Sequence, residues 1–145
     1  MPRLNINFSG PKDGWLGIRI QADGEEMVVQ ASHTPHDTLT EFAEALVQIL
    51  ETGSSKSIPI NEEPEASTLQ FFSEGDHLLI QHTMEGRKPN SPTQTIRAPF
   101  QSSTREIARK LKFLYEDVGY DGFVKHWRRR PPKEQIARAW SQFAP

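Results

Sequence analysis

The sequence lacks cysteine altogether among its 145 residues. Disulfides and thiolate-ligated metal sites are therefore excluded, and this absence favours a cytoplasmic location. Long hydrophobic runs are missing too: no stretch approaches the roughly 20 apolar residues of a membrane-spanning helix. The first residues contain no apolar run of signal-peptide length. We therefore expect a soluble, cytoplasmic protein that does not contact a membrane.

The familiar motifs of catalysis and nucleotide binding are also missing from the sequence. There is no Gly-x-Ser-x-Gly nucleophile elbow, no Gly-x-x-x-x-Gly-Lys phosphate loop and no His-Glu-x-x-His zinc motif. The glycines are scattered at turns instead. We predict a protein that uses no cofactor and is not an enzyme, with an unrecognised His/Asp site as an alternative.

Apolar residues make up 35% of the chain and fall into periodic clusters. Alternation over residues 4–8, 16–20 and 27–29 predicts three short strands. Asp23-Gly24 is a signal for a tight hairpin turn between the second and third strands. Short connections favour an antiparallel meander, because parallel strands need a long crossover.

A helix is predicted over residues 37–50, where apolar side chains recur with the spacing of one buried stripe. Either Thr34-Pro35 or a capping box of Thr38 with Glu41 is expected to begin the helix. Gly53 supplies a left-handed stop. The stripe consists of Leu39, Phe42, Ala43, Leu46, Val47 and Leu50.

A second group of strands is predicted around residues 58–60, 69–71, 78–82 and 93–100. Ser103 with Glu106 forms a predicted capping box for a helix that ends at Gly119, and a short helix closes the chain. This order of elements is typical of an α+β fold. We expect a single domain over residues 1–145. It should contain one antiparallel sheet of about six or seven strands, packed by one long helix and by C-terminal helices.

Charge is unevenly distributed along the chain. Residues 1–102 contain seven Lys/Arg and fourteen Asp/Glu, whereas residues 103–145 contain ten Lys/Arg and five Asp/Glu. Such asymmetry can indicate a partner of opposite charge. It can equally mean that the two parts attract one another within the fold, and the sequence leaves both interpretations open.

His33, His36 and Asp37 form the cluster that most resembles a catalytic or metal site. Two imidazoles and a carboxylate could share a metal or position a base. A metal site needs three or four convergent ligands, however, and no second cluster has a matching spacing. We predict instead that this segment begins a helix, with Asp37 placed favourably against the helix dipole. No metal site and no catalytic residue are therefore assigned.

Acidic residues gather at two predicted turns, and they are the candidate binding residues. The spacing of a calcium loop is absent from them, so a solvated loop or a docking surface for a basic partner remains. We predict the docking surface, which consists of Glu62, Glu63, Glu65, Glu74 and Asp76.

A basic segment near the C-terminus is the alternative site. Arginine binds phosphates bidentately and an aromatic ring can stack on a base, so this segment could contact nucleic acid. Against this, the pI is about 6.2, and Trp127 could instead be an anchor in the core. The residues of this patch are Lys125, Trp127, Arg128, Arg129, Arg130 and Lys133.

The overall organisation resembles small bacterial proteins encoded beside toxin or secretion genes, including immunity proteins of polymorphic toxin systems. Three features carry the resemblance: the strand meander that runs into the helix of residues 37–50, the Glu63-Pro64 turn before a Gly75-Asp76 hairpin, and the closing helix after Trp127 and Pro131-Pro132. The resemblance carries over no site residue. It implies a protein that binds and blocks a partner without chemistry of its own.

Together these observations predict a protein-binding module, of an immunity or inhibitor type, that binds a partner protein through its acidic surface. Nucleic-acid binding through the basic segment is the alternative. A homo-oligomer is also compatible with the sequence, because an unpaired edge strand offers backbone groups to a second copy.

Overall fold

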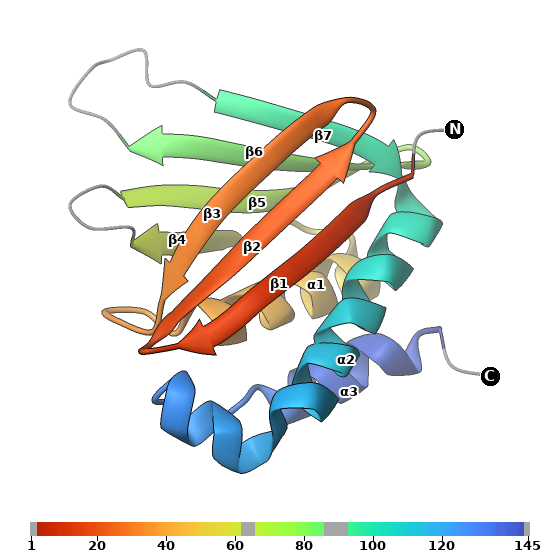
Figure 1. The fold of residues 1–145 in the computed structure, drawn as a ribbon. Helices are drawn as coiled ribbons and strands as arrows, with labels where there is room; N and C mark the ends of the chain where they lie inside the picture. The colour runs from red at the N-terminus through yellow and green to blue at the C-terminus, as the bar shows by residue number, and fades with distance from the viewer. Residues whose placement is uncertain (1–2, 62–65, 86–92, 144–145) are drawn as a thin grey trace.

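A computed structural model describes residues 3–61, 66–85 and 93–143 of the chain. These residues form seven strands and three helices, shown in Figure 1. In chain order they are β1 (Asn5–Lys12), β2 (Trp15–Ala22), β3 (Glu25–Ser32), α1 (Thr38–Thr52), β4 (Ser57–Asn61), β5 (Ala66–Glu74), β6 (His77–Glu85), β7 (Thr93–Pro99), α2 (Phe100–His126) and α3 (Lys133–Ser141).

The strands form two antiparallel sheets, of order β1-β2-β3 and β4-β5-β6-β7. The predicted α+β class and antiparallel pairing are confirmed, but the expected single sheet is divided in two. Helix α1 lies between β3 and β4 in the chain and contacts strands of both sheets. Alternation in a sequence identifies the buried face of each strand, but it does not identify the strand with which it pairs.

Two Asp-Gly turns connect the strands of the first sheet. Asp13 and Gly14 have φ values of 54° and 80°, and Asp23 and Gly24 have values of 51° and 78°. Positive φ at both central residues matches the right-handed twist of the flanking strands. The hairpin predicted at Asp23-Gly24 is therefore present, with Ala22 opposite Glu25.

Helix α1 begins at a cap other than the two predicted from the sequence. The Asp37 carboxylate accepts a hydrogen bond from the backbone N of Thr40 at 3.1 Å. The starts predicted at Thr34 and at Thr38 with Glu41 are therefore wrong. An aspartate at this position satisfies one of the free N–H groups of the first turn. The predicted stop is confirmed, because Gly53 has a φ of 73° and its N–H bonds to the carbonyl of Ile49.

Phe42 on α1 joins the two sheets across the core. Its ring lies edge-on to Phe8 of β1, with centroids 5.9 Å apart, and edge-on to Phe71 of β5 at 5.3 Å. Buried side chains from both sheets and all three helices form one continuous hydrophobic cluster around this contact. Edge-to-face pairs are a favourable geometry for aromatic rings, so Phe42 stabilises both sheet–helix interfaces at once.

Helix α2 starts at Phe100, three residues before the predicted start, and no side chain caps it. The predicted capping box does not form, since Ser103 is buried inside the helix and Glu106 binds Arg109. Gly119, with φ 75° and ψ 163°, interrupts the helix where the sequence predicted its end. A second helical stretch follows this interruption and continues to His126.

In the described ranges, none of the helices is both long enough and apolar enough to cross a membrane. Helix α2 instead runs beside the edge strand β1, as Figure 1 shows. The amine of Lys110 on α2 donates a hydrogen bond to the side-chain oxygen of Asn7 on β1 at 3.1 Å. The helix therefore covers one open edge of the first sheet, where exposed backbone groups would otherwise invite pairing.

We expect Phe42→Ala to lower the free energy of unfolding by about 3–5 kcal/mol, because it leaves a cavity between two sheets and a helix. Urea unfolding followed by circular dichroism measures this. Phe113→Ala is the matched control, since Phe113 is 47% exposed and Phe42 is fully buried. Equal losses in the two variants would contradict a core centred on Phe42.

Candidate functional site

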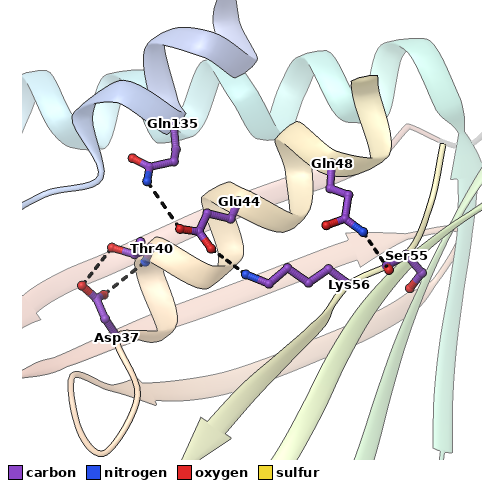
Figure 2. Close-up of polar contacts among 7 residues, drawn as sticks. All are labelled: Asp37, Thr40, Glu44, Gln48, Ser55, Lys56 and Gln135. Carbon is purple, nitrogen blue, oxygen red and sulfur yellow. Dashed lines mark hydrogen bonds and ion pairs between the residues drawn. The ribbon is translucent and has the colours of Figure 1, made fainter. Parts of the chain in front are cut away.

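The carboxylate of Asp37 is fully engaged in structural contacts. Its two oxygens accept hydrogen bonds from the Thr40 backbone N at 3.1 Å and from the Thr40 hydroxyl at 2.8 Å, as Figure 2 shows. The indole N–H of Trp127 donates a third bond to the same carboxylate at 3.0 Å. A carboxylate held in this way caps a helix and satisfies a buried donor.

His33 belongs to the same junction. Its Nδ1 lies 3.2 Å from the carbonyl oxygen of Gly14, and its ring lies edge-on to Trp127 at 6.2 Å. The guanidinium of Arg129 donates a hydrogen bond to the His33 carbonyl at 2.7 Å. The first hairpin, the start of α1 and the end of α2 therefore meet at His33.

The predicted cluster does not converge on a common point. His36 is exposed, whereas His33 is half-buried and turned toward Gly14. Within the parts of the chain that the structure describes, no group of three or more His, Asp or Glu side chains is placed to hold a metal ion. The contacts of Asp37 and His33 are structural, since Asp37 caps helix α1 and the ring of His33 packs against Trp127.

The basic C-terminal segment alternates between inward and outward side chains. Trp127 is 0% exposed and packs in the core, so it cannot stack on a base. The interpretation of Trp127 as a core anchor is therefore the correct one. Arg129 is also turned inward, toward the His33 carbonyl, whereas Arg128 and Arg130 are exposed. The two inward residues attach the loop to the body, and the outward residues project from it.

Four exposed cations form a surface that we call the basic ridge: Lys125, Arg128, Arg130 and Lys133. No carboxylate within the described ranges forms an ion pair with any of the four. Arg128 adopts a left-handed backbone conformation with a φ of 68°. This conformation costs a non-glycine residue about 1–2 kcal/mol. The ridge thus combines uncompensated positive charge with a strained backbone.

Only part of the charge asymmetry is neutralised inside the fold. Of the ion pairs between described residues, one joins the acidic first 102 residues to the basic remainder. In this pair the Arg138 guanidinium binds both Glu51 oxygens, each at 2.6 Å. It bridges α1 and α3 across a groove of about 470 Å³. Neighbouring Glu44 is occupied by Lys56 at 2.6 Å and by Gln135 at 3.5 Å (Figure 2).

Two of the five predicted acidic residues lie in the part of the chain that the structure describes. Glu62, Glu63 and Glu65 lie outside the described residues. Glu74 and Asp76 lie at the exposed turn between β5 and β6, where Glu74 is 3.6 Å from Arg97. At the other end of β5, Ala66 pairs with the exposed Glu85, the last residue of β6. The rise of the strand puts about 26 Å between Ala66 and Glu74, so described acidic residues lie at both ends of this sheet.

Between the two acidic ends lies one face of the β4–β7 sheet, which we call the open face. Phe71 points toward α1, so its neighbours Gln70 and Phe72 point to the opposite side. Most side chains on this side are only half-buried. The register aligns them in three rows across β5, β6 and β7: Phe72, Leu79 and Arg97, then Gln70, Gln81 and Thr95, then Thr68, Thr83 and Thr93.

Strands β4, β5 and β6 of the open face belong to a part of the chain with acidic residues only, since residues 57–86 contain six Asp/Glu and no Lys/Arg. Strand β7 contributes one basic residue, Arg97, to the face. Glu74 and Asp76 were predicted from the sequence as binding residues, but the open face was not. The feature of the sequence that could have identified it is the composition of the strand residues that point away from the core. Apart from Arg97, the three rows consist of threonine, glutamine and two large apolar residues.

We expect Asp37→Ala to lower the free energy of unfolding by about 2–4 kcal/mol, because it removes a helix cap and leaves the buried Trp127 N–H without an acceptor. Asp37→Asn keeps an acceptor oxygen, so its loss should be clearly smaller. In a Trp127→Phe background, Asp37→Ala should cost only the cap, about 1 kcal/mol. Urea unfolding of the four variants measures both contributions. An equal cost in both backgrounds would show that the indole bond contributes nothing.

Comparison of the chain with models of protein families, with curated proteins and with solved structures finds no match in any of the three. The resemblance to immunity proteins therefore stays a prediction. The candidate functions that remain are those of the surfaces described above, the open face with its acidic ends and the basic ridge.

Proposed function

We propose that this protein is a protein-binding module of the inhibitor or immunity type, and that a basic partner protein docks on the open face. The observation that carries the proposal is the combination of a half-buried sheet face with acidic residues at both of its ends. The module needs no catalytic group and no cofactor for this role. Its partner should present lysine or arginine residues around a flat, mixed polar and apolar patch.

The composition of the open face supports recognition of a protein. Phe72 and Leu79 lie directly opposite each other on neighbouring strands, and together they form an apolar pair near the Glu74 end of the face. The glutamine and threonine rows beside them offer donors and acceptors that can bond a partner. Protein interfaces commonly combine apolar contacts with polar ones in this way.

The acidic ends of the face support the choice of a basic partner. Glu74 and Asp76 are both exposed, and Glu74 makes a long ion pair with Arg97 at 3.6 Å. Exposed ion pairs at such distances contribute little to stability. These carboxylates can therefore bind a basic partner with little loss of folding stability. Charge of this kind mainly accelerates and orients association.

The proposal is tested with the full chain as bait in a lysate of the cells that express it, followed by association kinetics with the captured protein. We expect the double variant Glu74→Lys/Asp76→Lys to slow association by about tenfold or more at low salt. We expect Phe72→Asp to accelerate dissociation, because it replaces an apolar contact of the interface with a charge.

The matched control is Asp117→Lys/Asp121→Lys, which makes the same change of charge at two exposed positions of α2. It should leave both rates near those of the unchanged protein. If the two double variants slow association equally, only net charge matters, and the open face is not the binding surface. A partner that binds all variants alike at every salt concentration would also overturn the proposal.

The basic ridge favours nucleic acid as a second candidate function. Its four cations lie within nine residues, are all exposed, and are attached to the body through the inward side chains of Trp127 and Arg129. Arginine and lysine in such a surface neutralise phosphates and release counterions. The buried position of Trp127 removes base stacking by this ring, so only the phosphate contacts of this hypothesis remain.

We expect the triple variant Lys125→Gln/Arg128→Gln/Arg130→Gln to weaken binding of a single-stranded oligonucleotide by at least about tenfold at roughly 50 mM salt. The dependence of log affinity on log salt should also become less steep, by about 0.7 for each phosphate that is no longer neutralised. Fluorescence anisotropy measures both quantities. Arg19→Gln is the control, because it removes an exposed arginine from another surface. Unchanged affinity of the triple variant would eliminate this candidate.

A further inference from the structure

A polar cleft lies where the start of β1 meets the first turns of α2, a region visible beside the N-terminus in Figure 1. Its volume is about 680 Å³. Leu4, which is 4% exposed, contributes an apolar part of the wall. We call this site the arginine cleft, and the polar part of its lining consists of Arg3, Asn5, Ser102, Arg105, Glu106 and Arg109.

The charge of the arginine cleft is positive and only partly compensated. Glu106 is occupied by Arg109, whose guanidinium binds both carboxylate oxygens, with contacts of 2.6 and 3.0 Å. Arg3 and Arg105 are exposed, and neither forms an ion pair with a described residue. Two guanidinium groups therefore line the cleft without a carboxylate, next to a third that already has one.

The beginning of α2 adds hydrogen-bond donors to the same place. The N-cap residue is Pro99, no side chain caps the helix, and its first turn contains no acidic residue. The N–H of Phe100 is taken by the carbonyl of Asp76 at 2.7 Å. The other N–H groups of a helix's first turn have no partner within the helix, and they favour negative charge. Ser102, which belongs to this turn, also lines the cleft.

Hydrogen bonds connect and stabilise the two elements that border the cleft. The Lys110 amine on α2 holds Asn7 on β1 at 3.1 Å, close to the cleft in both elements. Thr104 is buried, and its hydroxyl donates to the carbonyl of Phe100 at 2.8 Å, which stabilises the first turn of α2. Because the strand and the helix are attached in this way, the backbone that carries Arg3 and Arg105 has its position without a ligand.

We propose that the arginine cleft binds a small phosphorylated compound, with its phosphate monoester group between Arg3 and Arg105. A dianionic phosphate matches two uncompensated guanidiniums, each of which can donate two parallel hydrogen bonds. The cleft is larger than a phosphate group alone, so it has room for a small organic part against Leu4. This binding is independent of the partner proposed for the open face, which belongs to the other sheet.

Titration of the isotopically labelled full chain with inorganic phosphate, at constant ionic strength, tests the proposal by two-dimensional NMR. We expect saturable shifts of the Asn5, Ser102 and Ser103 amides. Arg105→Gln should weaken the affinity by about tenfold or more, because it removes a charge-assisted hydrogen bond. Arg128→Gln is the control variant. Because Arg105 and Arg128 are both exposed, we expect both variants to remain folded, and their thermal unfolding temperatures check this.

Three results would overturn the proposal. Shifts that rise linearly without saturation would show general ionic attraction only. Saturable shifts confined to the basic ridge, and abolished in Arg128→Gln, would place the anion on the ridge. Equal affinity of the unchanged chain and of Arg105→Gln would show that the cleft arginine does not bind the anion.

A second titration, with a nucleoside monophosphate, tests the organic part of the ligand. Tighter binding than that of inorganic phosphate would support an organic group packed against Leu4. Weaker binding would overturn this part of the proposal and limit the site to the free ion.

Discussion

The hydrogen bond between the Trp127 indole and the Asp37 carboxylate, 3.0 Å long, joins the end of α2 to the start of α1. The same carboxylate caps α1, whose Phe42 packs against both sheets. Because Trp127 is fully buried, its N–H would be left without an acceptor if Asp37 moved. The position of α1 and the course of the chain after α2 are therefore fixed together by one group.

This junction also decides which charges reach the surface. Trp127 and Arg129 point inward and Arg128 and Arg130 are exposed, so the ridge is presented on a loop that is attached to the body. The open face of the β4–β7 sheet has the opposite charge at its ends, with Glu74 and Asp76 at one end and Glu85 at the other. Most of the ion pairs in the described ranges form within one part of the chain and not between the two. The positive and negative surfaces consequently remain available to different ligands.

The cluster that most resembled a catalytic or metal site in the sequence contains two residues with structural roles. His33 and Asp37 occupy a junction of three segments. In contrast, the cleft with Arg3 and Arg105 carries no sequence motif, because its residues lie about a hundred positions apart. Such a site can be recognised only when the strand and the helix are seen side by side.

The sequence by itself determined the antiparallel strands, the core side of each strand, the helix that contains Phe42 and its stop at Gly53, since local periodicity and glycine conformation encode them. The stripe predicted for this helix is correct at Leu39, Phe42, Ala43 and Leu46, but Ile49 is buried where Val47 and Leu50 were predicted. Only the tertiary structure decided that the strands form two sheets and that Trp127 is buried with its N–H bonded to Asp37. These outcomes depend on contacts between residues distant in the chain. Local patterns contain no information about which distant partner supplies the hydrogen bond or fills the space.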